Sequence, residues 1–443
     1  MRDQLMLAVM LFMLPMAFMN GFVAFLMWVY MTLLAPHGYL YGFMIDFRYT
    51  FVFAVLSLGA LVLGRVKDRG YFLVDKLMVL LLLFITHVLL SAVINMNSNP
   101  MVEYRLEYFI KGMALAVAAP FFINSRWRIH MVLIVLVAGL GFHGIQNGLK
   151  MISSGGTHIV SGIPRSTLAD NNLFAVGMVM LLPLTLYLAR YSASRLAKWA
   201  ALGVFGLCVM AVLGSNSRGG FLALAILGVW YWITSPRKLI STLFVAIVAI
   251  TVMQVAPDRW FDRMETIKNA DQDMSFIGRV AAWKVSVNIA NDNPVFGAGF
   301  DATQVKWIWD KYKQASNFID VNIPEGIAYK AAHSNYFQVL GDLGYVGLLL
   351  FLALLAAAFV TRWQIKSLAT KTPGDNAWSV DLATAINLSL VAFIAGGAGV
   401  SLAYFELAHL LIVILAIIRR LLIQQAALAP ARNISIGETV VHA

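Results

Sequence analysis

Apolar runs of about 20 residues recur along most of this sequence. A run of that length, folded as an α-helix, is what crossing roughly 30 Å of bilayer hydrocarbon requires. Hydrophobic residues make up 60% of the 443 residues and charged residues only 12%. An average soluble domain has about 25% charged residues. The predicted fold class is therefore an all-α polytopic membrane protein.

About twelve membrane-spanning helices are predicted from these runs. The first run is too long for one span and contains Pro15, Asn20 and Gly21, so it forms either one kinked helix or two short ones. The predicted spans cover residues 4–34, 46–65, 75–95, 105–123, 129–146, 171–190, 197–215, 218–234, 239–256, 335–361, 381–401 and 405–424. Four regions follow from them: spans one to nine in 1–256, a large loop at 257–334, spans ten to twelve in 335–424, and a tail at 425–443.

Lys and Arg concentrate in alternate short connections between the predicted spans. These basic connections are 65–70, 124–130, 190–198, 235–239, 361–366 and 418–420. Such connections face the cytoplasm in multi-pass proteins. We therefore expect a bacterial inner-membrane protein with both termini cytoplasmic and the large loop periplasmic. The net charge of +11 is then a consequence of topology, and no nucleic-acid partner is expected.

The large loop at 257–334 has enough Trp, Phe and Tyr to build a small packed unit. Its pattern predicts an amphipathic helix from near Gly278 to 291–294, where Pro294 stops it, and a second helix over 301–315. We expect both to lie against the outer membrane face, because Trp and Tyr anchor well at that interface.

Three polar clusters stand where a predicted span begins on the outer side. They are IPRSTLADNNLFA at 163–175, GSNSRGGF at 214–221 and AAHSNYFQ at 331–338. A helix that enters from outside points its free N–H groups and positive dipole end outward, which suits an anion. Together with Arg165 and Arg218, whose guanidinium groups match phosphate oxygens, three such helix ends would suit a pyrophosphate.

Each cluster supplies a residue that can cap its helix. The candidates are Asp170 or Asn171 in the first cluster, Ser217 in the second and Ser334 in the third. Asn171 and Asn172 are typical of caps and turns, with a contact to a sugar or phosphate as the alternative.

The arginines also have ordinary interpretations. Arg218 could simply extend from a helix end toward the interface, but the two glycines after it allow another group to approach the backbone closely, which favours a functional role. Arg165 is either a loop charge or an anion ligand. Arg279 would become a ligand only if the amphipathic loop helix lies over the three clusters.

His333 precedes a helix N-terminus, where the dipole disfavours the imidazolium form. A neutral imidazole can act as a general base. The alternative is a histidine bonded to a loop carbonyl. The neighbouring Asn335, Tyr336 and Gln338 either support such a site or belong to an ordinary helix start.

Other polar residues in the spans have structural explanations. Glu107 and Lys111 are spaced for an i,i+4 pair. Asp342 lies two turns into span ten, and a carboxylate at that depth is expected to face a cavity. The only cysteine, Cys208, excludes a disulfide framework and a thiolate metal site. No metal site is predicted.

The constellation of motifs resembles the bacterial O-antigen ligase family. The resemblance rests on RSTLADNNLFA, on SRGG opening a later helix, on GRVAAWK and NPVFGAGF in the large loop, and on HSNYFQVLGDLGYVG after it. Residues 34–47, LAPHGYLYGFMIDF, are also similar to the exosortase-associated O-glycosylation ligases. Members of the ligase family are multi-spanning, C-type glycosyltransferases.

The resemblance implies transfer of a whole glycan from undecaprenyl pyrophosphate to a lipid A–core sugar at the periplasmic face, with no cofactor. On matching positions Arg218 and Arg279 would bind the pyrophosphate, with Arg165 as a weaker match, and His333 would activate the acceptor hydroxyl. The polymerases and protein O-oligosaccharyltransferases of related pattern use the same donor and remain alternatives, as does a flippase for a lipid-linked sugar. The expected partners are the carrier-linked glycan, the acceptor and membrane lipids, and the expected state is a monomer.

Overall fold

The computed structural model describes residues 1–71, 74–234, 274–319 and 326–428, together with 238–239, 242–243, 246, 250 and 323. Every regular element within these residues is a helix. The helices are α1 Arg2–Met19, α2 Gly21–Leu34, η1 Pro36–Gly38, α3 Tyr49–Val62, α4 Lys76–Asn95, α5 Met101–Phe122, α6 Arg126–Ser153, α7 Asn171–Tyr191, α8 Arg195–Gly214, α9 Arg218–Thr234, α12 Met274–Asp292, η3 Ala302–Gln304, α13 Lys306–Tyr312, α14 Asn335–Lys371, α15 Ala377–Gly396 and α16 Glu406–Leu428.

Eight of the described helices are long and apolar enough to cross a membrane, and α3 and α9 are shorter apolar helices that pack among them. The prediction of an all-helical polytopic protein is confirmed. The number of twelve spans and the periplasmic position of the large loop stay predictions. Most of the predicted span at 239–256, the large loop up to residue 273, and the tail from residue 429 lie outside the described residues.

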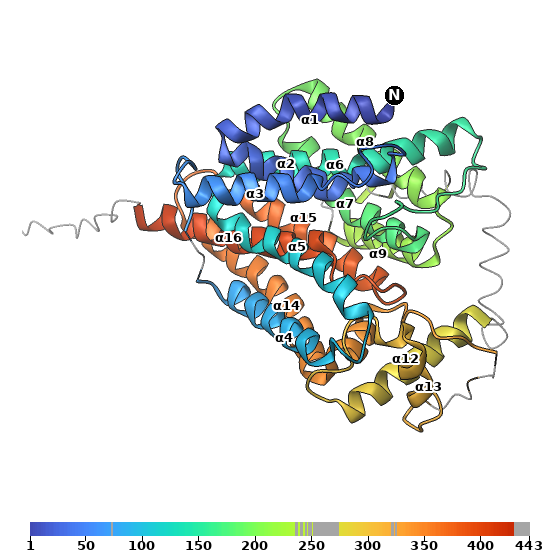
Figure 1. Ribbon diagram of the computed structural model, residues 1–443. Helices are drawn as coiled ribbons and strands as arrows, with labels where there is room; N and C mark the ends of the chain where they lie inside the picture. Colours follow the sequence, from blue (N-terminus) through green and yellow to red (C-terminus); the bar gives the residue numbers. More distant parts are fainter. Residues whose placement is uncertain are drawn as a thin grey trace, which may run out of the picture.

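The overlong first run forms two helices, α1 and α2. Asn20 interrupts the run with extended backbone (φ −139°, ψ 110°), and its Oδ1 accepts a hydrogen bond from Phe22 N at 2.9 Å, capping α2. The second helix runs back beside the first (Figure 1). Asp3 Oδ1 consequently meets the loop after α2 and accepts bonds from Gly42 N and Met44 N.

This hairpin places the N-terminus and the last described turns of α16 at opposite ends of the bundle. The N-terminus lies beside residues 39–44, at the end of the bundle where Asp46 pairs with Arg165. The last turns of α16 lie at the opposite end, where Arg420 donates to Tyr71 O and Ile123 O (Figure 1). The tail from residue 429 lies outside the described residues, so the prediction that both termini are cytoplasmic stays a prediction.

Several basic connections gather at the end of the bundle where α16 finishes. Arg128 donates to Lys67 O at 2.7 Å, and Arg190 pairs with Asp381 at 3.2 Å. The grouping agrees with the predicted alternation of basic connections, and its assignment to the cytoplasm stays a prediction.

Helix α7 lies at the centre of the bundle and packs against α6, α8, α9 and α15. Most of its side chains are buried. A Cβ added to Gly220 on α9 would lie only 2.4 Å from Ala175 Cβ on α7, so this glycine is needed for the close approach of the two helices. The N-terminal turns of α7 and α9 are thereby held side by side.

Helices α12 and α13 form a small packed unit at one end of the bundle (Figure 1). Its core includes Ala281, Val285 and Ile289 on α12 and Trp309 on α13. The first helix predicted in the large loop is confirmed, although it begins at Met274, and its amphipathic character and position on the membrane face stay predictions. The second predicted helix, over 301–315, is wrong in extent, because non-helical backbone at 301 and 305 divides it into η3 and α13.

The long helix α14 is broken at Gly344, whose φ of +70° and ψ of −170° are not helical. The NPVFGAGF segment fills the break: Ala298 N donates to Gly341 O at 3.0 Å and Tyr345 N donates to Pro294 O at 2.8 Å. A Cβ at Gly344 would lie 2.5 Å from Pro294 O, so only glycine fits. The segment and the break together fix the first two turns of α14.

Candidate active site

A cavity of about 480 Å³ lies where α5, α7, α14 and the connection before α16 meet. We call it the His333 cavity. Its lining brings together His333, Arg165, Asp170 and Gln338 from two of the predicted clusters. Residues distant in the sequence, including Arg105, also contribute to its wall.

The His333 imidazole is half-buried, and it forms no hydrogen bond with any residue that the structure describes. Burial lowers the pKa of His333 below its ordinary value of 6.5, the positive charges of Arg279 and Lys330 lower it further, and Asp170 opposes them. The ring is thus neutral at neutral pH, as predicted. The causes are burial and the nearby cations.

Helix α12 lies over the start of α14, which is the arrangement that Arg279 needs to act at this site. Trp283 Nε1 donates to Ala332 O at 2.8 Å, and its ring stacks on Phe337 with 5.0 Å between centroids. These contacts fix the segment before His333 against α12. The electrostatic effect of Arg279 on His333 follows from this packing.

The first turns of α7, α9 and α14 meet at the last turn of α15. Asn335 N donates to Gly397 O at 2.6 Å. A Cβ at Gly219 would lie 3.8 Å from Gly396 O, and one at Gly396 would lie 2.5 Å from Val176 Cγ2. The three predicted clusters therefore converge, with their helix N-termini at one end of the bundle.

The two other arginines occupy different places. Arg218 is the first residue of α9, and Ser217 caps this helix as predicted, because its Oγ accepts from Gly220 N at 3.1 Å. Arg218 does not line the His333 cavity. Arg165 lines the cavity with a positive φ of 56°, and its Nη1 lies 3.4 Å from Asp46 Oδ1. Both side chains of that pair are mostly exposed.

The amides in the first cluster are used in the structure itself. Asp170 caps α7 by accepting from Asn172 N at 2.8 Å. Asn171 Nδ2 donates to Ser215 O at 2.7 Å, and Asn172 Nδ2 donates to Asn171 Oδ1 at 3.1 Å. The cap interpretation of these residues is therefore confirmed for Asp170.

Ser334 occupies the N-cap position of α14, but its side chain makes no capping hydrogen bond, so the predicted role of its hydroxyl is wrong. Its neighbours hold the connection between α15 and α16. Asn335 Oδ1 accepts from Leu402 N at 2.6 Å, Gln338 Oε1 accepts from Ala403 N at 3.2 Å, and Tyr336 OH donates to Ile394 O at 2.9 Å. Of these three side chains, Gln338 also lines the cavity.

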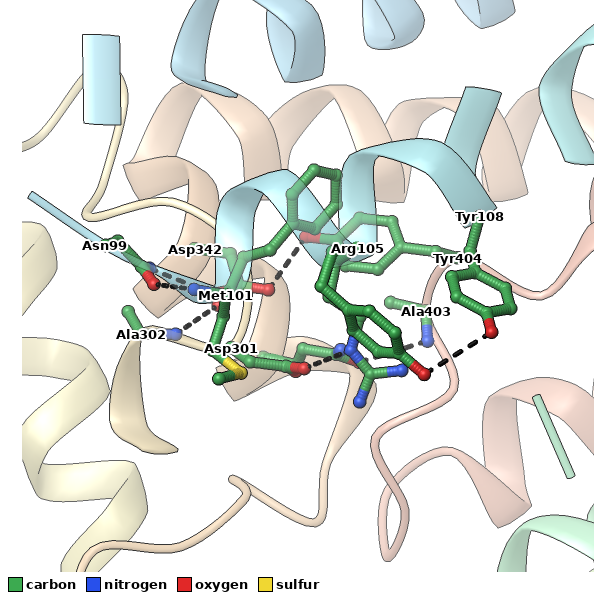
Figure 2. Close-up of polar contacts among 12 residues, drawn as sticks. Asn99, Met101, Arg105, Tyr108, Asp301, Ala302, Asp342, Ala403 and Tyr404 are labelled. Carbon is green, nitrogen blue, oxygen red and sulfur yellow. Dashed lines mark hydrogen bonds and ion pairs between the residues drawn. The ribbon is translucent and has the colours of Figure 1, made fainter. Parts of the chain in front are cut away.

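A buried polar group that the sequence did not reveal joins α5, α14 and the large loop (Figure 2). Arg105 Nε donates to Asp301 Oδ2 at 2.5 Å, and Asp342 accepts from Ala302 N at 3.2 Å and from Tyr404 OH at 3.0 Å. Asp342 is 2% exposed and does not line the cavity, so its predicted orientation is wrong. These two hydrogen bonds within the protein satisfy the Asp342 carboxyl group.

Comparison with protein families gives two matches. The model described as O-antigen ligase matches residues 203–352, a range that contains Arg218, Arg279 and His333. A family of unknown function (DUF5935) matches residues 1–193. No curated protein matches the chain.

Proposed function

Because the match over residues 203–352 supports assignment of this chain to the O-antigen ligase family, we propose that the protein transfers a glycan en bloc from undecaprenyl pyrophosphate to a lipid A–core sugar. The observation that carries the proposal is the His333 imidazole, which lines a cavity without a hydrogen-bond partner among the described residues and lies within the field of Arg279. The active site faces the periplasm of a bacterial inner membrane in this proposal.

In the proposed reaction the acceptor hydroxyl gives its proton to a ring nitrogen of His333. Its oxygen bonds to the anomeric carbon as the bond from that carbon to the pyrophosphate breaks. A single displacement of this kind inverts the anomeric configuration. General-base catalysis of this kind contributes about 10²- to 10⁴-fold to a rate.

The leaving pyrophosphate gains negative charge as that bond breaks. Arg218 and Arg279 stabilise it, with help from the N-terminal N–H groups of the helices that converge at α15. Arg165 on the cavity wall supplies a third cation. Fixed positive groups can stabilise the negative charge that develops on the leaving group, which is the role of a divalent metal in other enzymes. The proposed reaction is therefore independent of metal.

Two related activities share the donor chemistry, namely polymerisation of the glycan and its transfer to a protein hydroxyl. The donor site alone does not separate them from ligation. A flippase is less well supported, because the polar groups that line the His333 cavity gather at one end of the bundle and not along a path through it.

The proposal is tested with purified protein in lipid, carrier-linked glycan, and lipid A–core, protein or glycan acceptors, with EDTA present. We expect transfer to lipid A–core, and we expect His333→Ala to lower kcat by about 10²- to 10⁴-fold. The matched control is His130→Ala, on α6 near the basic end of the bundle, which leaves kcat unchanged. Full activity of His333→Ala would falsify the base assignment, and loss of transfer in EDTA from folded protein contradicts the metal-free reaction.

A further inference from the structure

A second cavity, of about 460 Å³, adjoins the His333 cavity. The two share wall residues, among them Tyr104, Tyr108, Thr167 and Glu406. We call the second cavity the Arg48 chamber. Since the same side chains line both hollows, a ligand in the chamber is separated from the His333 cavity by one layer of side chains.

The chamber is built from a different part of the chain than the ligase match. None of its lining residues falls within 203–352. They come from α2, α3, α5, α6, the loops at 35–48 and 163–168, and residues 405–406 at the start of α16. Arg218 and Arg279, two of the three proposed pyrophosphate ligands, lie within that match, whereas the third, Arg165, lines the wall that the chamber shares with the His333 cavity. The rest of the chamber is therefore available for the other substrate.

The charges of the chamber favour an anion. The basic residues Arg48, Lys111 and Arg165 line it together with the acidic residues Asp46 and Glu406, and Asp46 pairs with Arg165. Arg48 forms no ion pair or side-chain hydrogen bond with the part of the chain that the structure describes. The pair between Lys111 and Glu107, at 2.5 Å, is exposed and leaves other ammonium hydrogens available.

Aromatic rings line the chamber beside these cations. They are Tyr49, Phe51, Tyr104 and Tyr108. Apolar and aromatic walls with a few placed polar groups are typical of small-molecule sites. Rings suit the faces of a sugar, and cations suit a phosphate or carboxylate on it.

The loop that carries Arg48 is held in place before any ligand arrives. His37 Nδ1 lies 2.6 Å from Ile45 O, and Tyr49 OH donates to Met44 O at 2.7 Å. A loop already fixed in its binding conformation loses less entropy when a ligand binds.

We propose that the Arg48 chamber binds the acceptor, and that this acceptor is an acidic saccharide. Arg48 and Lys111 hold its phosphate or carboxylate, and its nucleophilic hydroxyl extends past Tyr104 and Tyr108 into the His333 cavity. The direction of transfer rests on the proposed function, whereas binding of an acidic saccharide does not.

Binding is measured on the purified full-length protein with three trisaccharides, ending in glucose 6-phosphate, glucuronate or glucose. We expect at least one acidic trisaccharide to bind about tenfold more tightly than the neutral one, a difference of about 1.4 kcal/mol. The tighter of the two acidic probes identifies phosphate or carboxylate as the anion. Equal binding of all three overturns the proposal.

Two variants test the residues, Arg48→Gln and Lys111→Gln. Each weakens binding of the preferred acidic probe about tenfold and leaves the neutral probe unchanged. The control is Arg190→Gln, an arginine paired with an aspartate at the other end of the bundle, which leaves both unchanged. Because Arg48 lies on an exposed loop, we expect Arg48→Gln to fold, and it tests the proposal even if Lys111→Gln does not fold. Unaltered binding of the acidic probe by Arg48→Gln refutes Arg48 as a ligand of the saccharide.

Transfer assays separate this proposal from the proposed function. Arg48→Gln raises KM for an acidic acceptor and leaves KM for the donor unchanged. If wild-type protein binds the acidic probe but transfers nothing, the proposed function fails and the chamber stands. If transfer occurs and Arg48→Gln leaves the acceptor KM unchanged, the chamber fails and the proposed function stands.

Discussion

Arg105 donates through Nε to Asp301 Oδ2 at 2.5 Å, joining residues 196 apart in the sequence at the wall of the His333 cavity (Figure 2). The Asp301 side chain is 5% exposed and that of Arg105 is 45% exposed. The bond ties α5 to the segment that fills the break in α14. The bond therefore fixes the position of the packed unit of α12 and α13 against the bundle at the proposed active site.

Arg105→Gln is expected to lower the free energy of unfolding by about 1–3 kcal/mol, because it leaves a buried carboxylate without its charged partner. Asp301→Asn is expected to cost less, since a neutral amide can still bond to Arg105 and asparagine tolerates the positive φ of 52°. Denaturation in detergent measures both variants and the double variant. Strict additivity of the two changes contradicts a direct interaction. The partly exposed pair of Arg190 with Asp381 is the control, and Arg190→Gln should change stability by less than about 1 kcal/mol.

The pH dependence of transfer should report on His333. The base is the neutral form, so activity is lost as pH falls through the His333 pKa, which lies below 6.5. Arg279→Gln removes a charge that lowers this pKa, and the acid limb of kcat/KM should move to higher pH. Asp170→Asn removes a charge that raises it, and the limb should move to lower pH. Profiles of both variants that shift in the same direction, or not at all, exclude His333 as the titrating group.

Gly344→Ala should destabilise the protein by at least about 2 kcal/mol and abolish transfer. The added methyl group would lie 2.5 Å from Pro294 O, at a backbone φ of +70° that alanine adopts only with strain. The matched control is Gly206→Ala in α8, where a Cβ meets nothing within 4 Å. That change should stabilise the helix by about 0.5–1 kcal/mol. Thermal unfolding and a transfer assay are measured on both variants. Equal effects of the two changes would contradict the role of the NPVFGAGF segment in fixing the break in α14.

The sequence predicted features that depend on local physics. Apolar runs and helix caps such as Asp170 and Ser217 are encoded within a few residues, and the structure has them as expected. The break at Gly344 was not predicted, because its sequence surroundings are those of one apolar helix. The amide of Tyr345, freed by the break, bonds to Pro294 O, a residue 50 positions before Gly344 in the chain.

Long-range pairing explains the other differences. Arg105 stands at the start of an apolar helix, and nothing near it in the sequence indicates Asp301 as its partner. Asp342 was recognised as costly, but its partners, Ala302 N and Tyr404 OH, come from other segments. The convergence of Arg279 with His333 likewise depends on where α12 packs, which helical periodicity alone does not determine.

Trp283→Phe tests whether α12 positions His333 through the backbone. Phenylalanine keeps the stacking on Phe337 but loses the bond from Nε1 to Ala332 O, 2.8 Å long, immediately before His333. The segment carrying His333 should loosen, kcat should fall by about tenfold, and the acid limb should move toward 6.5 as Arg279 acts on His333 less strongly. The control is Trp307→Phe on α13, which loses an equivalent bond from Nε1 to Ser98 O at 3.1 Å, away from the cavity lining. If both variants lower kcat alike with unshifted pH profiles, the Trp283 bond stabilises the loop unit without positioning the base.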